Sequence, residues 1–179
     1  MRKVSFVFLI FVGIFFSLRS HAGPLASLGT QMSFEYDADG RNYEIRQPLS
    51  LRGGYRFRHL DLYLEFSRFT QSNQVSYLQI KREHTEWIGW ARHIFRNKWI
   101  AQPYGALGFG IQYDTVTTNF ANDSARDEGT PYSLASLAGG VRFLIAKRLN
   151  IDLEGRASVS ETYAPNPLLG AGLYAGWSF

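Results

Sequence analysis

Apolar and polar residues alternate along most of this chain, in segments of about ten residues separated by stretches rich in turn-forming residues. Successive side chains of a β-strand point to opposite faces, so this pattern predicts strands with one apolar and one polar face. The clearest segment is the last one, in which every second residue is apolar and the residues between are small or polar. Its apolar residues are Leu169, Ala171, Leu173, Ala175, Trp177 and Phe179.

Six further segments alternate in the same way, at 28–36, 49–57, 60–67, 106–113, 136–145 and 149–159. An eighth segment, 83–95, alternates less regularly. We place Arg92 on its inward face, because an arginine in mid-bilayer costs on the order of 2–4 kcal/mol. Glu86 and Trp90 then also point inward, Trp87, Gly89 and Ala91 point outward, and Ile88 is an apolar residue on the inward face.

Two folds can use such strands: a soluble antiparallel sandwich and a closed barrel in a membrane. The polar faces collect six acids and six arginines, and a balance of this kind favours the barrel. Eight strands enclose a lumen that side chains just fill, so charges inside it must pair. Lipid also forbids an open sheet edge. We therefore predict an all-β, transmembrane, antiparallel up-and-down β-barrel of eight strands, with a lumen charge network of Glu35, Arg46, Arg52, Arg56, Asp61, Glu65, Glu86, Arg92, Arg142, Asp152, Glu154 and Arg156.

Residues 1–22 have the form of a signal peptide: Arg2 and Lys3, an apolar run from 4 to 16, and small residues before a cut after Ala22. A membrane helix would need roughly 20 apolar residues. We expect residues 23–179 to be the barrel domain. Without Arg2, Lys3 and Arg19, the 19 basic residues fall to 16 against 15 acidic ones, so charge gives no reason to expect nucleic-acid binding. The chain has no cysteine, which excludes a lipoprotein anchor, disulfides and thiolate metal ligands.

Short and long connections alternate along the chain. The short ones are 57–59, 95–98 and 146–148; the longer ones are 37–42, 70–74, 115–131 and 161–167. Outer-membrane barrels keep short turns in the periplasm, so we expect both termini there. Residues 120–129 should form a polar outer loop, and 75–82 could continue a strand above the bilayer. Pro48 and Pro103 should each mark a bulge or a strand end.

Two motifs resemble the small eight-stranded outer-membrane barrels, the family around outer-membrane proteins A, X and W. Gly-Leu-Tyr-Ala-Gly-Trp-Ser-Phe at 172–179 is similar to their C-terminal signal, and Pro-Tyr-Gly-Ala-Leu-Gly-Phe-Gly-Ile at 103–111 to their glycine-rich middle strand. The resemblance implies an outer-membrane location and contact with outer-membrane lipid and lipopolysaccharide. It also implies a monomer, a chain that ends with the barrel, and recognition by the barrel-assembly machinery through Leu173, Trp177 and Phe179.

Three functions remain open. We favour a structural or surface-interaction barrel with no catalytic, cofactor or metal site. Interfacial aromatic girdles would comprise Tyr36, Tyr55, Trp87, Tyr113, Trp177 and Phe179. A narrow channel is the first alternative, because inward glycines leave space: Gly108, Gly110, Gly140, Gly170, Gly172 and Gly176.

The second alternative is a lipid A-modifying enzyme. Lipid A deacylases place a His-x-Ser motif on a late strand, whereas this chain has Arg156-Ala157-Ser158-Val159-Ser160 there, and a serine without a base is a poor nucleophile. Ser160 beside Glu161 does not supply that base. We expect the histidines His59, His84 and His93 to be solvated residues at the ends of strands.

Overall fold

The computed structural model describes residues 23–36, 43–75, 78–95, 98–120, 123–160 and 167–178. They form ten strands, and none of them forms a helix long and apolar enough to cross a membrane. The predicted signal peptide, the connections 37–42 and 161–166, and Phe179 lie outside the described residues. The strands are β1 (Gly23–Tyr36), β2 (Tyr43–Arg46), β3 (Leu49–Phe57), β4 (Leu60–Val75), β5 (Leu78–Ile94), β6 (Ala101–Phe120), β7 (Asp123–Glu128), β8 (Tyr132–Leu144), β9 (Leu149–Ser160) and β10 (Leu168–Ser178).

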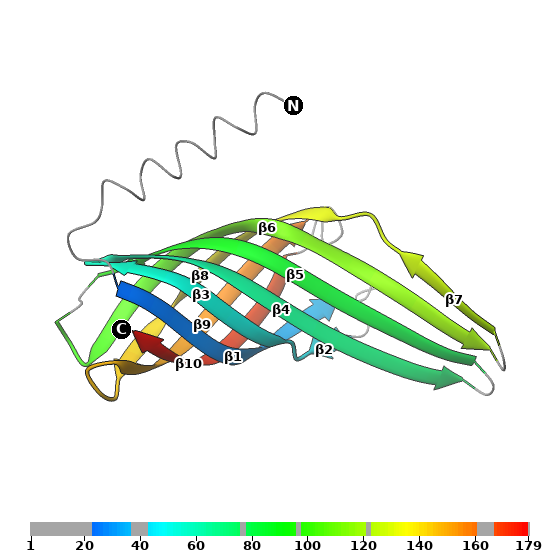
Figure 1. Ribbon diagram of the computed structural model, residues 1–179, viewed down its shortest axis with the longest axis horizontal. Helices are drawn as coiled ribbons and strands as arrows, with labels where there is room; N and C mark the ends of the chain where they lie inside the picture. The colour runs from blue at the N-terminus through cyan, green and yellow to red at the C-terminus, as the bar shows by residue number, and fades with distance from the viewer. Residues whose placement is uncertain are drawn as a thin grey trace, which may run out of the picture.

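Eight of these strands close into a barrel. The strands pair antiparallel in the order β1, β3, β4, β5, β6, β8, β9 and β10, and β10 pairs back to β1 (Figure 1). The closing ladder runs from Leu25 opposite Ser178 to Phe34 opposite Leu169. The predicted fold, a closed antiparallel up-and-down barrel of eight strands, is confirmed.

The remaining two strands lengthen the barrel wall at one end. Strand β2 continues the ladder of β3 along β1, and Pro48 lies between them, where its carbonyl accepts from the Gln31 amide and the Thr30 hydroxyl. Strand β7 pairs with the last residues of β6. Pro48 thus lies between two strands, and Pro103 is the third residue of β6. Both positions agree with the expected strand ends.

The prediction that 70–74 and 115–131 are loops is wrong. Strand β4 continues to Val75 and β6 to Phe120, and β5 begins at Leu78, so these strands extend well past the rest of the barrel (Figure 1). Residues 123–128, expected within a polar loop, form β7. Polar side chains on both faces hide the alternation there, whereas backbone pairing continues without it.

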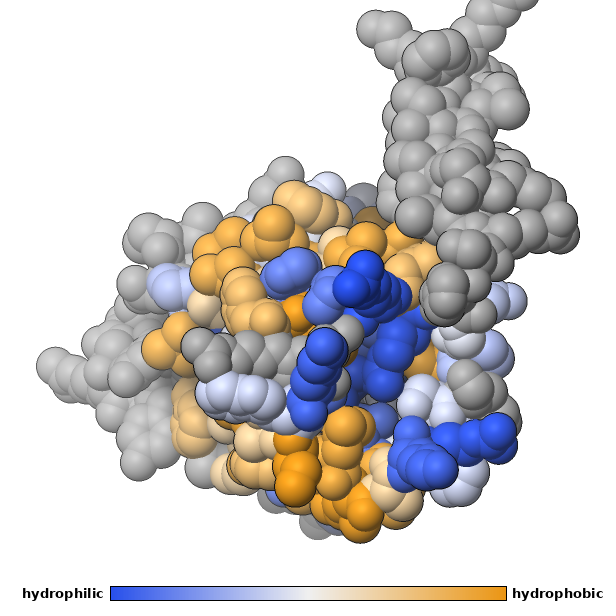
Figure 2. Space-filling model, turned by 90° about the vertical axis from the view of Figure 1, so that its left-hand side faces the viewer, coloured by the Kyte–Doolittle hydropathy of each residue, from blue (hydrophilic) through white to orange (hydrophobic). Residues whose placement is uncertain are grey.

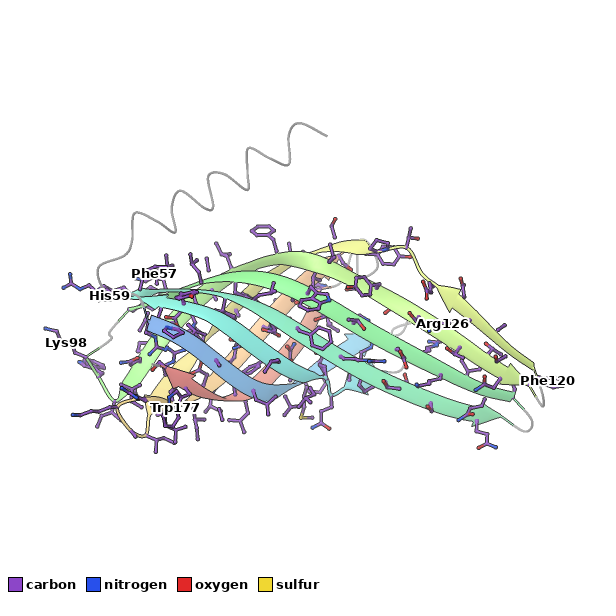
Figure 3. All side chains as sticks on the ribbon, viewed as in Figure 1. Phe57, His59, Lys98, Phe120, Arg126 and Trp177 are labelled. Atoms are coloured by element: carbon purple, nitrogen blue, oxygen red, sulfur yellow. The ribbon has the colours of Figure 1, made fainter. Side chains whose placement is uncertain are left out.

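The two ends of the barrel differ. The short connections and the first residue of β1 lie at one end, with Phe57, His59, Lys98 and Trp177, and we call it the turn end; β4, β5 and β6 extend from the other, the loop end, with Phe120 and Arg126 (Figure 3). Seen from the turn end, hydrophilic residues gather in the centre and at the lower right, and hydrophobic residues lie above and below the centre (Figure 2).

Large apolar side chains cover the outside of the barrel. Leu51, Leu64, Leu137 and Leu153 are each about half exposed, and Phe109 is 70% exposed. A face of this extent is unsuited to water and suited to hydrocarbon. Strand β5 follows the predicted alternation, with Trp87, Gly89 and Ala91 exposed and Glu86, Trp90 and Arg92 buried. Ile88 is fully buried and packs in a cluster with Tyr63, Trp90 and Ala106, so its inward place is no defect.

The structure describes some of the residues predicted for the aromatic girdles and the C-terminal signal. Tyr55, Trp87 and Trp177 are each 38–46% exposed on the outer face, and Leu173 is 51% exposed on β10. Tyr113 is half-buried. The side chain of Tyr36, and Phe179 entirely, lie outside the described residues.

Two neighbouring glycines of β3 offer a matched test of the packing. A Cβ added to Gly54 would lie 2.1 Å from the Leu62 carbonyl oxygen and 2.5 Å from the Tyr63 Cα, backbone atoms that cannot move aside. A Cβ on the outward Gly53 would meet nothing within 4 Å. We expect Gly54→Ala to lower the free energy of unfolding by about 1–3 kcal/mol and Gly53→Ala to leave it unchanged or slightly higher. Urea titration of both variants in vesicles measures the difference, and equal midpoints would refute the strand packing described.

Candidate functional site

The middle of the lumen holds two buried clusters of four charges each. The first, which we call the loop-end quartet, consists of Arg52, Glu65, Glu154 and Arg156, from strands β3, β4 and β9. Arg52 donates from Nε to Glu65 Oε2 at 2.8 Å and from Nη2 to Glu154 Oε1 at 2.7 Å. Arg156 Nη2 lies 2.7 Å from Glu65 Oε2 and 3.2 Å from Glu154 Oε1. Each arginine thus contacts both acids, and the quartet is electrically neutral.

The second cluster, the turn-end quartet, repeats this arrangement with Asp61, Arg92, Arg142 and Asp152. Arg92 donates to Asp61 Oδ2 at 2.7 Å and to Asp152 Oδ2 at 2.6 Å. Arg142 donates to the same two carboxylates, at 3.1 and 2.8 Å. Arg56, partly exposed at the edge, adds a bond of 3.1 Å to Asp61. All four members of the quartet are 2% exposed or less. Replacing any one of them by an uncharged residue would therefore leave a buried charge without its partner.

Tyrosine rings lie between the two quartets. The Tyr63 ring is 5.3 Å from the Arg52 guanidinium and 5.0 Å from that of Arg92. Tyr104 lies 4.9 Å from Arg92 and donates its hydroxyl to Glu154 at 3.1 Å. The Tyr174 ring is 3.3 Å from Arg52. Cation–π attraction adds to the ion pairs, and the rings fill the lumen between the charged layers.

Nine of the twelve residues expected in the lumen are thus in contact with one another: the eight quartet members and Arg56. Glu86 lies nearer the loop end, where it accepts from the Ser67 hydroxyl and pairs with His84. Arg46 lines a cavity at the mouth of the barrel instead. The side chain of Glu35 lies outside the described residues.

The expectation that His84 is a solvated residue is wrong. It is 7% exposed, and its ring bonds to Asp114 through Nδ1 and to Glu86 through Nε2, the latter at 2.8 Å. Residues 84 and 86 continue the buried inward face of β5, so the alternation that put Glu86 inside could have put His84 there as well. The residue that the sequence analysis missed is Asp114. It lies opposite His84 on β6, and only the register of β5 against β6 brings the two together.

His84 lies above the apolar band, level with an exposed ion pair between Arg68 and Glu83 on the outer face. Burial works against its positive charge, but the bonds to Asp114 and Glu86 outweigh burial and raise the pKa of His84 to about 9. Burial likewise opposes the charge of Asp114, and the bond from His84 nevertheless holds the pKa of Asp114 below its usual value. His84 is therefore an imidazolium at neutral pH.

This pair makes the stability of the mouth dependent on pH. The pKa of His84 in the folded state exceeds the ordinary value of 6.5. The contribution of His84 to the free energy of unfolding is therefore complete below about pH 6.5 and is lost as the pH rises through about 9. Asp114→Asn should lower the pKa of His84, because it removes one negative charge and leaves only a neutral amide oxygen as the acceptor. Nuclear magnetic resonance of the imidazole ring measures the pKa of His84 in the wild-type protein and in the variant. An unchanged pKa in the variant would contradict the bond between His84 and Asp114.

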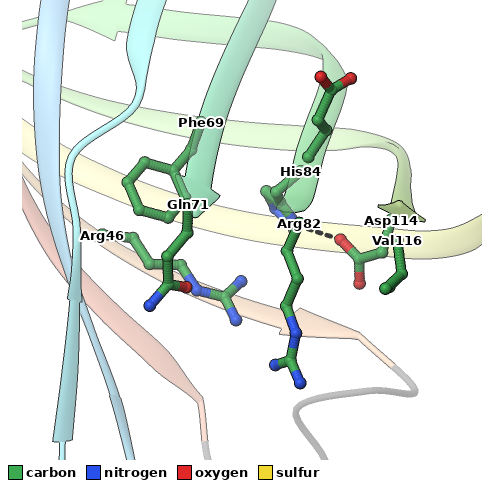
Figure 4. Close-up of a pocket in the computed structure, with 8 residues that line it drawn as sticks. Arg46, Phe69, Gln71, Arg82, His84, Asp114 and Val116 are labelled. Carbon is green, nitrogen blue, oxygen red and sulfur yellow. Dashed lines mark hydrogen bonds and ion pairs between the residues drawn. The ribbon is translucent and has the colours of Figure 1, made fainter. Parts of the chain in front are cut away.

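The cavity at the loop-end mouth has a volume of about 150 Å³. Its walls come from β2, β4, β5 and β6, and consist of Arg46, Phe69, Gln71, Arg82, Glu83, His84, Asp114 and Val116. The guanidinium groups of Arg46 and Arg82 extend to the same side of the His84–Asp114 pair (Figure 4).

The described residues bring together no group of three or more histidine, aspartate or glutamate side chains suited to a metal ion. Ser158 bonds to the Ser136 hydroxyl at 2.8 Å. His59 and His93 lie near each other at the turn end, with ring centroids 6.3 Å apart and the rings tilted by 32°.

No protein-family model matches this sequence, and no curated protein matches it either. Solved structures do match the fold. The attachment invasion locus protein Ail of Yersinia pestis superposes with a TM-score of 0.57 at 13% identity, covering 88% of this chain and 97% of Ail. Neisserial surface protein A gives 0.58 at 14%, covering 88% and 95%. The N-terminal barrel domain of Pseudomonas aeruginosa OprF gives 0.52 at 14%, covering 89% and 100%.

These likenesses concern architecture, since the identities are low. They agree with the closed antiparallel ladder described above. The chain has the fold of the small eight-stranded outer-membrane β-barrels.

Proposed function

We propose that this chain is an integral outer-membrane protein that acts through its loop end, as a structural or surface-interaction barrel and not as a pore or an enzyme. The observation that carries the proposal is the pair of neutral quartets. They place bonded charges and aromatic rings across the lumen, and paired charges of this kind obstruct the passage of a solute. The part of the protein left for function is its surface.

The shape of the loop end supports the same role. Strands β4 to β7 carry polar and charged side chains beyond the apolar band, including the exposed pairs Arg68–Glu83 and Arg126–Glu128. A paired sheet holds these side chains in fixed positions, as a recognition surface requires. The proposal includes a cleaved leader at 1–22, both termini in the periplasm, a monomeric barrel among outer-membrane lipid and lipopolysaccharide, and delivery by the barrel-assembly machinery.

The structural neighbours are consistent with this role. One is named an attachment invasion locus protein and another a surface protein. Ail is also known in complex with the heparin analogue sucrose octasulfate, with a TM-score of 0.58 to this chain. We infer that this barrel also meets polyanionic molecules, and we place that contact at its loop end.

Single cysteines test the orientation, because the chain has none of its own. Ser124 on β7 and Lys147 in the β8–β9 turn are both exposed, at opposite ends. With a membrane-impermeant maleimide on intact cells, we expect Ser124→Cys to be labelled at once and Lys147→Cys only after the outer membrane is permeabilised. The reverse pattern would put the loop end in the periplasm and refute the proposed role.

A shortened barrel tests whether the extension carries the interaction. Residues 72–81 and 117–126 can each be replaced by Asn-Gly, a dipeptide suited to a two-residue hairpin turn. Circular dichroism and the heat-dependent shift in electrophoresis should show an intact barrel. Binding of sucrose octasulfate, measured by calorimetry, should be lost from the shortened protein. Equal binding by both proteins would exclude the extension as the interacting surface.

A further inference from the structure

The short connections at the turn end lie side by side, and backbone hydrogen bonds join them. The β3–β4 turn bonds to the end of β5, the β5–β6 connection bonds to the β8–β9 turn, and that turn bonds to the end of β10. The three bonds are Ile94 N to His59 O at 2.8 Å, Leu144 N to Ile100 O at 2.9 Å, and Ser178 N to Arg148 O at 2.9 Å. We call these joined segments the turn rim.

The turn rim is basic, and the sequence places no acid in it. No aspartate or glutamate occurs in the segments that form it: 57–60, 93–104, 143–151 and 172–178. Asp61 and Asp152 come directly after two of these segments, but both are buried in the turn-end quartet, where Arg92 and Arg142 bond to them. The basic side chains of the rim are Arg58, Arg96, Lys98, Lys147 and Arg148. Five positive charges thus face, at most, the one carboxylate of Phe179.

Large apolar side chains lie beside these bases. Ile100 is 76% exposed and Ile145 is 58% exposed, and the bond between Leu144 and Ile100 brings their two turns together. Trp99 is also exposed, and tryptophan is the residue typical of the headgroup level of a membrane. Lys98 precedes Trp99 directly, and Lys147 follows Ile145 by two residues; both lysines are exposed, and Lys98 lies at the tip of this end (Figure 3). The positive charge therefore lies where the apolar outer face ends.

This combination fits a phospholipid of negative net charge. Its acyl chains can pack against Ile100 and Ile145, while its headgroup accepts hydrogen bonds from the lysines and Arg148. The stem of a lysine can lie along apolar surface and still hold its ammonium group among headgroups. A zwitterionic phospholipid carries a cation of its own, which the basic rim repels. A soluble polyanion would use the charge of the rim but leave its apolar side chains in water.

We propose that the turn rim selects anionic phospholipids, such as phosphatidylglycerol, from the membrane leaflet at the turn end. This inference goes beyond the proposed surface role and rests only on the placement of the barrel in a membrane. Each lysine or arginine near a membrane surface favours anionic lipid about fivefold. The loop end differs, because Glu83 bonds to Arg68 and Lys81, and Glu128 bonds to Arg126.

Quenching of tryptophan fluorescence by lipids with brominated acyl chains measures which lipid contacts the rim. Of the four tryptophans, Trp90 is buried in the lumen, Trp87 lies farther along β5, away from the turn end, and Trp99 and Trp177 lie on the rim. The Trp87→Phe protein therefore keeps its lipid-facing tryptophans on the rim alone. In vesicles of phosphatidylcholine, brominated phosphatidylglycerol should bind there about fivefold more strongly than brominated phosphatidylcholine.

A second reporter shows whether the preference belongs to the rim. The double variant Trp99→Phe and Trp177→Phe leaves Trp87 as the exposed tryptophan. There the two brominated lipids should quench equally. An equal preference for phosphatidylglycerol at Trp87 and at the rim would overturn the proposal.

Two triple variants of the Trp87→Phe protein remove the same charge from opposite ends. The turn-end variant carries Lys98→Gln, Lys147→Gln and Arg148→Gln, and the loop-end variant carries Arg68→Gln, Lys81→Gln and Arg126→Gln. The turn-end variant should lose most of the preference, and the loop-end variant should keep it. The heat-dependent shift in electrophoresis checks that both variants are folded. Equal losses in the two variants would mean that lipid responds only to the net charge of the protein, and would refute the rim.

Salt and the plain lipid complete the test. In roughly 1 M salt the Debye length falls to about 3 Å, and the preference should fall with it; a preference unchanged by salt would contradict an attraction between charges. Brominated phosphatidylcholine should itself quench the rim tryptophans. If neither lipid quenched them, the membrane placement and the proposed function would both fail. Equal quenching by the two lipids would remove the lipid preference alone.

Discussion

Glu65→Gln is expected to lower the free energy of unfolding by about 3–5 kcal/mol, the cost of leaving a buried charge without its partner. Glu65 is fully buried and accepts from both Arg52 and Arg156. In the variant, two guanidinium groups share the single carboxylate of Glu154, and the loop-end quartet carries an uncompensated positive charge. Equilibrium unfolding in urea, with the protein folded into phosphatidylcholine vesicles, measures the loss.

A second substitution should restore part of the stability. Glu65→Gln together with Arg156→Met leaves the neutral pair Arg52–Glu154, which is joined by a bond of 2.7 Å. The double variant should be more stable than the sum of its two single variants predicts. Glu83→Gln is the matched control, because the Arg68–Glu83 pair is exposed and worth at most about 1 kcal/mol. Equal losses of unfolding free energy in Glu65→Gln and Glu83→Gln would contradict the burial of the loop-end quartet.

Leu153→Arg should destabilise the barrel by about 2–4 kcal/mol, the cost of an arginine at mid-bilayer on a lipid-facing strand. Leu153 is 49% exposed on β9, between Asp152 and Glu154 of the two quartets, and so lies at the middle of the wall. The same vesicle unfolding measures the change. The control is Thr117→Arg on the extension of β6, where the side chain lies beyond the apolar band and the cost should be small.

The same experiment separates a membrane barrel from a soluble sandwich. On a soluble protein, an exposed leucine replaced by arginine changes stability by no more than about 0.5 kcal/mol. A Leu153→Arg variant as stable as Thr117→Arg would therefore mean that the apolar outer face does not contact lipid.

The closed barrel was predictable from the sequence because alternation assigns every residue of a strand to one face. Even the irregular segment 83–95 was placed correctly, since the cost of Arg92 in lipid decides between its two orientations. The position of Ile88 shows the limit of that reasoning. The residue is apolar and faces a charged lumen, yet it packs with the rings of Tyr63 and Trp90.

The partners within the lumen were not predictable. Arg52 and Glu154 are 102 residues apart, and their contact depends on the stagger of all eight strands. A one-residue slip in any ladder would exchange inward for outward residues. The sequence indicated which charges share the lumen, but their division into two neutral quartets follows from register alone.

The loop end was the least predictable part. Alternation disappears where both faces of β4, β5 and β6 meet water, although backbone pairing continues to Val75, Leu78 and Phe120. Arg46 was assigned to the lumen by its parity, and its place beside Arg82 arises only because β2 continues the ladder of β3 past Pro48.

The central claim is that bonded charges close the lumen, and recordings from the purified protein in a planar bilayer test it most directly. We predict no steady open conductance for the wild-type chain, and none for the Asp114→Asn variant of the mouth. Long-lived open steps whose size changes when Arg52 or Glu154 is substituted would show that ions pass through the quartets, and would contradict this account.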